Sequence, residues 1–120
     1  MKYALMIFQN PGAFEALPED ERAALMKEFE AFNKEIEESG EFIGGHALAH
    51  PENAKTVRGR GGVPVTTDGP FAEAKEQLAG FYVVDVESTE RAVEIAQRDP
   101  ASRLWAIEVR PIMDSVGAEM

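Results

Sequence analysis

The segment at residues 2–8 is apolar on both of its faces. Side chains alternate between the two sides of an extended strand. Both sets here are hydrophobic: Tyr3, Leu5 and Ile7 on one side, and Ala4, Met6 and Phe8 on the other. Such a strand belongs in the middle of a sheet, because both of its faces need cover. Residues 80–86 repeat the pattern, so the chain must build a sheet with two central strands.

Periodicity and breaker residues define the other elements. Apolar residues recur at helical spacing over residues 19–39, between Pro18 and Gly40. We expect a second helix at residues 89–98, capped by Ser88, and a short one at residues 71–78. Further strands are expected at residues 41–49, 54–60, 63–67 and 104–110, the middle two forming a hairpin. This order predicts a single domain over residues 1–120, an α+β fold with a ferredoxin-like antiparallel sheet and both long helices on one face.

The two central strands also predict a partner. Helices on one face leave the other apolar face of the sheet uncovered. The same sheet from a second copy, packed about a two-fold axis, would cover it. We therefore expect a homodimer.

Composition narrows the function classes. Asp and Glu number 22 against 12 Lys and Arg, a formal net charge of −10, which disfavours nucleic acid and anionic membranes as partners. The chain has no cysteine, which excludes disulfides and cysteine-based zinc or iron–sulfur sites. We find no signal peptide or membrane span and expect a cytoplasmic protein. No phosphate loop, nucleophile elbow or dinucleotide fingerprint occurs, so we expect no cofactor.

The turn after the hairpin is the candidate site. Asp68 precedes Gly69 and Pro70, which break the strand. Its carboxylate could cap the short helix expected to follow, or it could act as a general acid/base at the mouth of a cleft. Both readings remain open on residue chemistry.

Four further residues belong to this hypothesis. His46, expected on the strand face of Phe42 and Leu48, is either a core or rim residue or an assistant in proton transfer. Arg58 could bind an anionic substrate or pair with Glu73 and Glu76. Phe71 is a core residue or a platform for substrate, and Glu73 a surface residue or a substrate contact. We expect no metal site, because His46 and His50 would lie about 13 Å apart on a strand.

Residues 67–81, from Thr67 through Asp68, Gly69, Pro70 and Phe71 to Phe81, resemble the signature of the YCII-related proteins, in the subgroup with the Asp-Gly-Pro-Phe (DGPF) motif. Other matching positions are Gly44, Gly45, Leu48, Thr56, Val57, Arg58 and residues 108–111. The resemblance implies a dimeric α/β-barrel arrangement and a largely unassigned function. It further implies a catalytic His–Asp pair in some members, with Asp68 as the acid, and genes often placed beside alternative sigma factors.

Two hypotheses follow. In the first, the protein is a cofactor-independent isomerase, lyase or oxygenase acting on a small carbonyl or carboxylate compound. Asp68 then moves a proton, His46 assists, and Arg58, Phe71 and Glu73 bind the substrate. In the second, it is a noncatalytic ligand-binding or regulatory dimer, linked to an alternative sigma factor.

Overall fold

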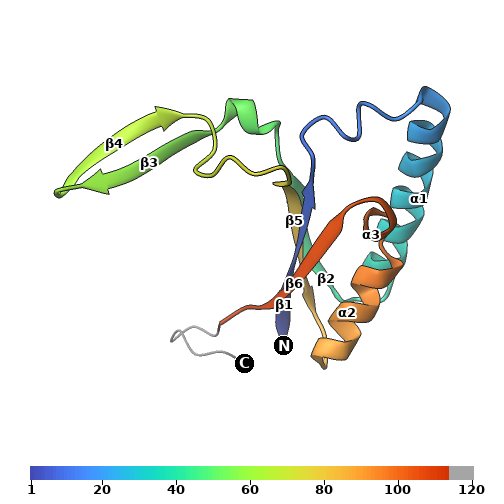
Figure 1. Cartoon of the computed structure of the whole chain (residues 1–120). Coiled ribbons are helices and arrows are strands. Elements are labelled where there is room, and N and C mark those ends of the chain that lie inside the picture. The colour runs from blue at the N-terminus through green and yellow to red at the C-terminus, as the bar shows by residue number, and fades with distance from the viewer. Residues whose placement is uncertain (114–120) are drawn as a thin grey trace.

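The computed structural model describes residues 1–113 and has a four-stranded antiparallel sheet at its centre (Figure 1). The strands are β1 (Lys2–Gln9), β2 (Phe42–Ala47), β5 (Gln77–Asp85) and β6 (Ala106–Pro111), in the order β2-β5-β1-β6. The apolar segments β1 and β5 are thus the two central strands. The α+β fold with an antiparallel sheet is confirmed.

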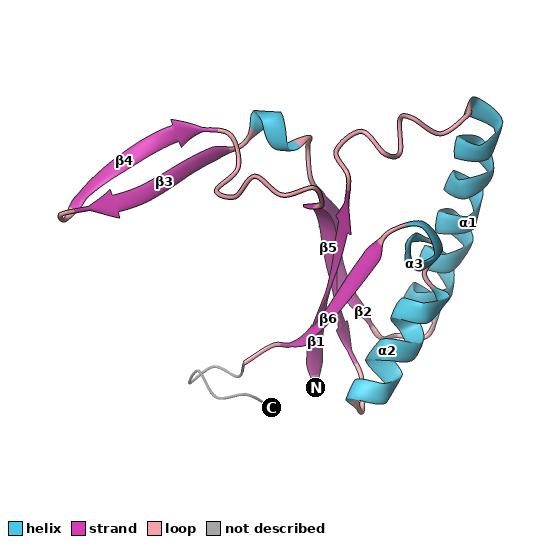
Figure 2. Cartoon of the chain, in the orientation of Figure 1, coloured by secondary structure: helices cyan, strands magenta, loops and turns pink. Residues whose placement is uncertain are grey.

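The α-helices of residues 1–113 lie on one side of the sheet (Figures 1 and 2). They are α1 (Glu19–Glu38), α2 (Thr89–Arg98) and α3 (Ala101–Leu104). Helix α1 buries Leu25, Phe32 and Ile36 as its periodicity predicts. Helix α2 buries Ala92, Ile95 and Ala96, whereas Val93 is 38% exposed.

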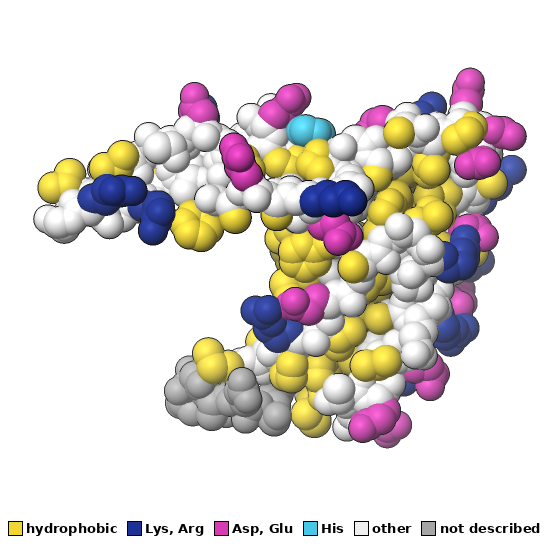
Figure 3. Space-filling model, in the orientation of Figure 1, with side chains coloured by type: hydrophobic (Ala, Val, Ile, Leu, Met, Phe, Trp, Pro, Cys, Tyr) yellow, Lys and Arg dark blue, Asp and Glu magenta, His cyan; other side chains and the backbone are white. Residues whose placement is uncertain are grey.

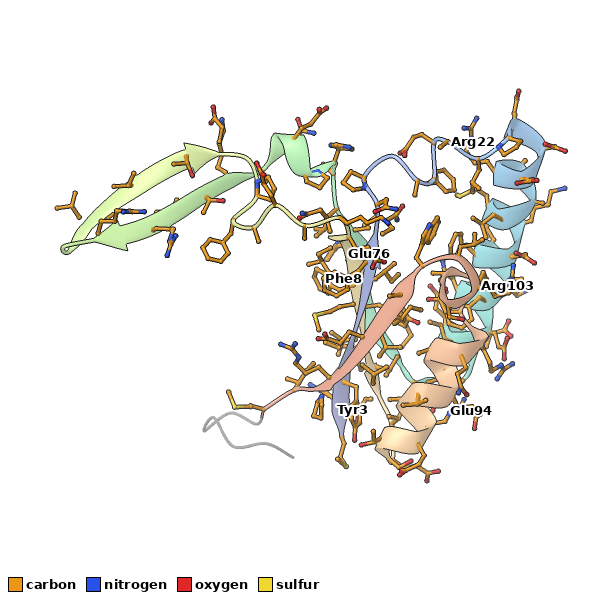
Figure 4. The ribbon with its side chains drawn as sticks, viewed as in Figure 1. Tyr3, Phe8, Arg22, Glu76, Glu94 and Arg103 are labelled. Atoms are coloured by element: carbon orange, nitrogen blue, oxygen red, sulfur yellow. The ribbon has the colours of Figure 1, made fainter. Side chains whose placement is uncertain are left out.

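The core lies between these helices and the sheet. Tyr3 and Leu5 of β1 and Val84 of β5 are fully buried there. The cross-strand register pairs Tyr3 with Val84 and Leu5 with Tyr82, so these four side chains share the helix-side face. The opposite, helix-free face carries the alternate residues, all of them half-buried: Ala4, Met6, Phe8 (labelled in Figure 4), Phe81 and Val83.

The predicted hairpin is confirmed, and it forms a separate two-stranded sheet. Strands β3 (Lys55–Arg60) and β4 (Val63–Asp68) follow a short 3-10 turn, η1 (Pro51–Asn53). The hairpin projects from the body of the protein on the helix-free side (Figure 1). Its valines at positions 57, 63 and 65 are 64, 63 and 43% exposed. An isolated two-stranded hairpin has little stability of its own, so these exposed valines indicate a hydrophobic surface that packs against other residues.

The prediction of a short helix at residues 71–78 was wrong. Residues 71–76 form an irregular loop, and β5 begins at Gln77. Gln77 and Leu78 pair with Gln9 and Phe8 of β1. This long-range pairing outweighs the helical propensity of the segment, which is a weak preference by comparison.

The last strand begins two residues later than predicted. Helix α3 occupies residues 101–104, a turn that the sequence reading assigned to no helix. Asp99 ends α2, and its Oδ1 accepts a hydrogen bond from the backbone N–H of Ala101 at 2.8 Å. That bond starts the new helix at the point where Pro100 breaks the old one. Among residues 1–113, no helix is long and apolar enough to cross a membrane.

Candidate functional site

A cavity of about 370 Å³ lies on the helix side of the sheet, between α1 and strands β2 and β5. Figure 3 shows hydrophobic side chains gathered between the sheet and α1. The large apolar and aromatic residues that line the cavity are Ile7, Phe14, Phe29, Phe42, Phe81, Tyr82 and Trp105. The polar ones are Gln9, Asn33, Glu37 and Asp99, and the His46 segment of β2 borders the cavity as well. Its size and composition fall in the range of small-molecule sites.

A buried tyrosine–aspartate pair forms one wall of this cavity. Tyr82 Oη donates a hydrogen bond of 2.9 Å to Asp99 Oδ2, and Asp99 is only 2% exposed. Burial raises the pKa of the Asp99 carboxyl, which its bonds to Ala101 and Tyr82 partly offset. Burial, together with the nearby charge of Asp99, raises the pKa of Tyr82. In the sequence, Asp99 directly follows the helix expected at residues 89–98 and Tyr82 lies in the strand expected at residues 80–86, and no motif marks either of them.

His46 lies on a different face from the one expected. A β-bulge between Phe42 and Gly44 shifts the register of β2 by one residue, so Phe42 pairs with Val84 but His46 pairs with Phe81. The His46 and Phe81 rings are 6.0 Å apart in an edge-to-face contact. Phe81 neighbours the helix-side Tyr82, so it points to the helix-free face, and His46 points there with it. The imidazole therefore lies on the side of the sheet opposite the Tyr82–Asp99 pair, although the His46 segment borders the cavity.

Asp68 lies at the base of the hairpin, where it forms an ion pair with Lys55 across the two strands. The Lys55 Nζ to Asp68 Oδ1 distance is 2.5 Å, and the Asp68 side chain is 87% exposed. The helix-cap interpretation was wrong, since no helix follows. The turn is held instead by the hairpin: Gly69 N–H donates to the Ala54 carbonyl and Thr56 Oγ1 donates to the Gly69 carbonyl. Gly69 has a φ of 90°, a left-handed conformation that favours glycine.

The hairpin and the loop after it carry the proposed binding residues. The Arg58 guanidinium carbon lies 4.9 Å above the ring centre of Phe71, a cation–π contact. Phe71 is 70% exposed, and Glu73 is exposed as well. Within residues 1–113, Arg58 forms no ion pair with Glu73 or Glu76.

The described chain thus groups the sequence-derived residues in two places. Asp68, Arg58, Phe71 and Glu73 belong to the hairpin and its loop, whereas His46 belongs to the sheet. None of the first four lines the helix-side cavity. No three His, Asp or Glu side chains of residues 1–113 cluster closely enough to hold a metal ion.

These features define an α+β protein with a one-sided helical layer, a helix-side cavity and a projecting hairpin. The sequence pattern of the YCII-related domain matches residues 1–115, and the chain belongs to that family. It is 31% identical over 116 residues to an uncharacterized protein of Rhizobium meliloti (strain 1021), covering 93% of this chain and 92% of the relative.

A solved structure has the same fold at low sequence identity. It is 5-chloro-2-hydroxyhydroquinone dehydrochlorinase (TftG) from Burkholderia phenoliruptrix AC1100, in complex with 2,5-dihydroxybenzoquinone. The TM-score is 0.56 at 14% identity, over 99% of this chain and 100% of the other.

Proposed function

We propose that this protein is a cytoplasmic, cofactor-independent enzyme of the DGPF subgroup that carries out acid/base chemistry on a small carbonyl or carboxylate compound. It acts as a homodimer in which two ferredoxin-like sheets form a dimeric α/β barrel. The connectivity β1-α1-β2 and β5-α2-β6, with the strand order β2-β5-β1-β6, supports the ferredoxin-like assignment.

One observation carries this proposal: the two central strands are apolar on the helix-free face of the sheet, and this face also bears a histidine. His46 lies there beside Phe81, in line with Met6 and Glu108 of the neighbouring strands. All three α-helices cover the other face (Figure 2). A second copy placed on this face buries its apolar rows and encloses the imidazole in a chamber.

The hairpin supplies Asp68, the second proposed catalytic residue. It projects on the helix-free side of its own sheet (Figure 1), so a two-fold partner placed on that face meets it. Asp68 of one subunit then meets His46 of the other. Asp68 takes a proton from the carbon next to the substrate carbonyl, and the electron pair moves to the carbonyl oxygen. His46 donates a hydrogen bond to that oxygen, and the proton returns to carbon or remains on Asp68 as a leaving group departs.

The substrate-binding residues are those on the hairpin side. Arg58, held over the ring of Phe71, presents a cation to an anionic or enolate oxygen. Phe71 offers an exposed aromatic surface to a planar substrate. Glu73, on the same loop, accepts hydrogen bonds from substrate hydroxyl groups. The dehydrochlorinase that shares this fold is named for a reaction on a ring compound and was solved with a quinone, which supports a planar carbonyl substrate.

Deuterium exchange tests the chemistry without knowledge of the substrate. The protein is incubated in D₂O with a panel of cyclic and open-chain dicarbonyl compounds and hydroxyquinones, and loss of the proton signal at carbon is followed by NMR. We expect exchange with the wild type that falls by about 100-fold or more in Asp68→Asn and His46→Gln. Exchange that is unchanged in both variants, or ligand binding with no turnover in any of them, contradicts the enzymatic proposal and favours a binding module.

Mixed dimers test whether the site crosses the interface. Asp68→Asn chains are unfolded and refolded together with His46→Gln chains. If the two groups come from different subunits, half of the chains pair as heterodimers, each with one intact site, and activity returns to about one quarter of wild type. No recovery contradicts a shared site, and gel filtration showing a monomer contradicts the dimer itself.

A further inference from the structure

The helix-side cavity is left unused by the proposed reaction, and its lining has an unusual charge pattern. Among residues 1–113, the lining holds Glu37 and Asp99 and no lysine or arginine. Five aromatic side chains accompany them: Phe14, Phe29, Phe42, Tyr82 and Trp105. Negative charge beside aromatic faces attracts organic cations, because the ring faces are themselves electronegative.

Glu37 is the free carboxylate of the cavity. Its side chain lies at the open rim of the cavity, where it is exposed, and forms no ion pair and no hydrogen bond among residues 1–113, although other glutamates do: Glu35 pairs with Arg98, and Glu28 with Arg103. Asn33 precedes Glu37 by one helical turn, so both lie on the same face of α1. Gln9 and Asn33 make no side-chain hydrogen bond in the described chain either. Three polar side chains therefore line an aromatic cavity without a protein partner.

Asp99 adds negative charge at the far wall. Each of its oxygens accepts one hydrogen bond, from Tyr82 and from Ala101. A carboxylate oxygen can accept two, so one acceptor position on each remains. Through these two bonds Asp99 links β5 to the start of α3. The position of its carboxylate is therefore fixed before a ligand binds.

The floor of the cavity is made of small residues. Gly45, Ala47 and Gly80 lie at the β2–β5 edge and leave room above the sheet. Gly45 is required there, since an added Cβ would come within 2.5 Å of Tyr82 Cβ. The volume of about 370 Å³ is enough for a compound of one ring and a short side chain.

We propose that this helix-side cavity binds an organic ammonium compound with an apolar ring, with Glu37 as the anchor for the cation and the aromatic side chains as the walls for the ring. A carboxylate ligand meets two like charges and no cation here. A neutral ring compound fills the same space but leaves Glu37 without a counter-ion. The site is separate from the helix-free face on which the proposed reaction rests.

The only tryptophan of the chain, Trp105, lines the cavity and reports on occupancy by its fluorescence. Three matched probes are titrated: 2-phenylethylammonium, 2-phenylethanol and 3-phenylpropionate. We expect saturable binding of the ammonium compound, at least about tenfold tighter than that of the alcohol, and no saturation with the carboxylate. Binding of the alcohol or the carboxylate as tight as that of the ammonium compound, or no saturation with any probe, overturns the proposal.

Two pairs of variants locate the binding. Glu37→Gln should weaken ammonium binding about five- to tenfold, and the control Glu38→Gln, which makes the same charge change at an exposed position outside the cavity, should leave it unchanged. Ala47→Phe should abolish binding by filling the floor, with the thermal midpoint measured to confirm folding. Asp68→Asn, at a position that does not line the cavity, should retain binding, so that failure of the proposed enzyme activity leaves this result standing. Equal affinities for Glu37→Gln and Glu38→Gln contradict Glu37 as the anchor.

Discussion

Tyr82 and Asp99, 17 residues apart in the sequence, form a hydrogen bond of 2.9 Å that ties the central strand β5 to the corner between α2 and α3. Asp99 is nearly fully buried, and Tyr82 is 8% exposed. Hydrogen bonds to a charged group contribute more than neutral ones, and a buried charge that loses a donor carries the full cost of desolvation. This pair is therefore expected to matter more than a neutral pair of similar geometry.

Tyr82→Phe should lower the free energy of unfolding by about 1.5–3 kcal/mol, because it removes one of the two donors to the buried carboxylate. Tyr3→Phe is the matched control: Tyr3 Oη lies 2.7 Å from Thr89 Oγ1, and both groups are neutral. That loss should be about 0.5–1.5 kcal/mol. Urea unfolding followed by circular dichroism measures both. A larger loss for Tyr3→Phe than for Tyr82→Phe would show that the Asp99 charge adds nothing.

Asp99 should make stability fall as the pH rises. Burial raises the pKa of its carboxyl in the folded state above the ordinary 3.8, so the folded state binds the proton more tightly than the unfolded state. The free energy of unfolding then decreases from about pH 4 upward, through the folded-state pKa. Asp99→Asn removes this dependence. The wild-type advantage over Asp99→Asn should be smaller at about pH 7.5 than at about pH 4; an advantage that grows with pH would reverse the assignment.

Glu41 should show the opposite dependence. Its hydrogen bonds with Arg91 lower the pKa of the carboxyl below the ordinary 4.5. This stabilisation is fully present above about pH 4.5 and is lost as the pH falls through the folded-state pKa. The wild-type advantage over Glu41→Gln should therefore shrink on acidification, as measured by urea unfolding between about pH 3 and about pH 6. An advantage independent of pH would mean that the ion pair contributes nothing.

The sheet could be predicted from the sequence because its signal is local. The two strands that are apolar on both faces, β1 and β5, are the central ones, and the spacing of Leu25, Phe32 and Ile36 gives the buried face of α1. These patterns report burial, which dominates the energetics of folding. They also led to the expectation that one sheet face lacks cover, as the helix-free face of the single chain does.

The candidate site was harder to predict because it depends on register and on long-range pairing. One extra residue in β2 moves His46 to the face opposite Phe42. The glycines at positions 44 and 45 indicate a bulge or a close approach of two strands, but they do not give the register on either side of it. The loop at residues 71–76 has helix-forming residues, but the pairing of Gln77 with Gln9 decides its conformation. The Tyr82–Asp99 pair could not be predicted either, because the two residues are 17 positions apart in the sequence and belong to different elements.

The Glu41–Arg91 pair should be sensitive to the shape of its cation. Arg91 Nε and Nη2 bind the two oxygens of Glu41 at 2.8 and 2.7 Å, a bidentate contact at 26 and 20% side-chain exposure. Arg91→Lys keeps the charge but loses the fork, so stability should fall by about 1–1.5 kcal/mol. The control is Arg103→Lys, because Arg103 forms a single 2.6 Å ion pair with Glu28 on the surface. There the change should stay within about 0.5 kcal/mol, and equal losses would contradict the geometric argument.

Two adjacent glycines in β2 should respond to the same substitution in opposite ways. A Cβ at Gly45 would lie 2.5 Å from Tyr82 Cβ and 2.6 Å from the Phe81 carbonyl oxygen, whereas a Cβ at Gly44 meets nothing within 4 Å. Gly45→Ala must push β2 away from β5, and we expect a loss of about 2–4 kcal/mol.

Gly44→Ala should be neutral or stabilising by up to about 1 kcal/mol, because alanine lowers the entropy of the unfolded chain. Thermal unfolding of the two variants side by side measures the contrast. Since Gly45 also borders the helix-side cavity, Gly45→Ala should weaken 2-phenylethylammonium binding while Gly44→Ala should not. Similar stabilities for the two variants would show that the strands can separate at little cost, and the close approach of β2 to β5 would not be what requires glycine at position 45.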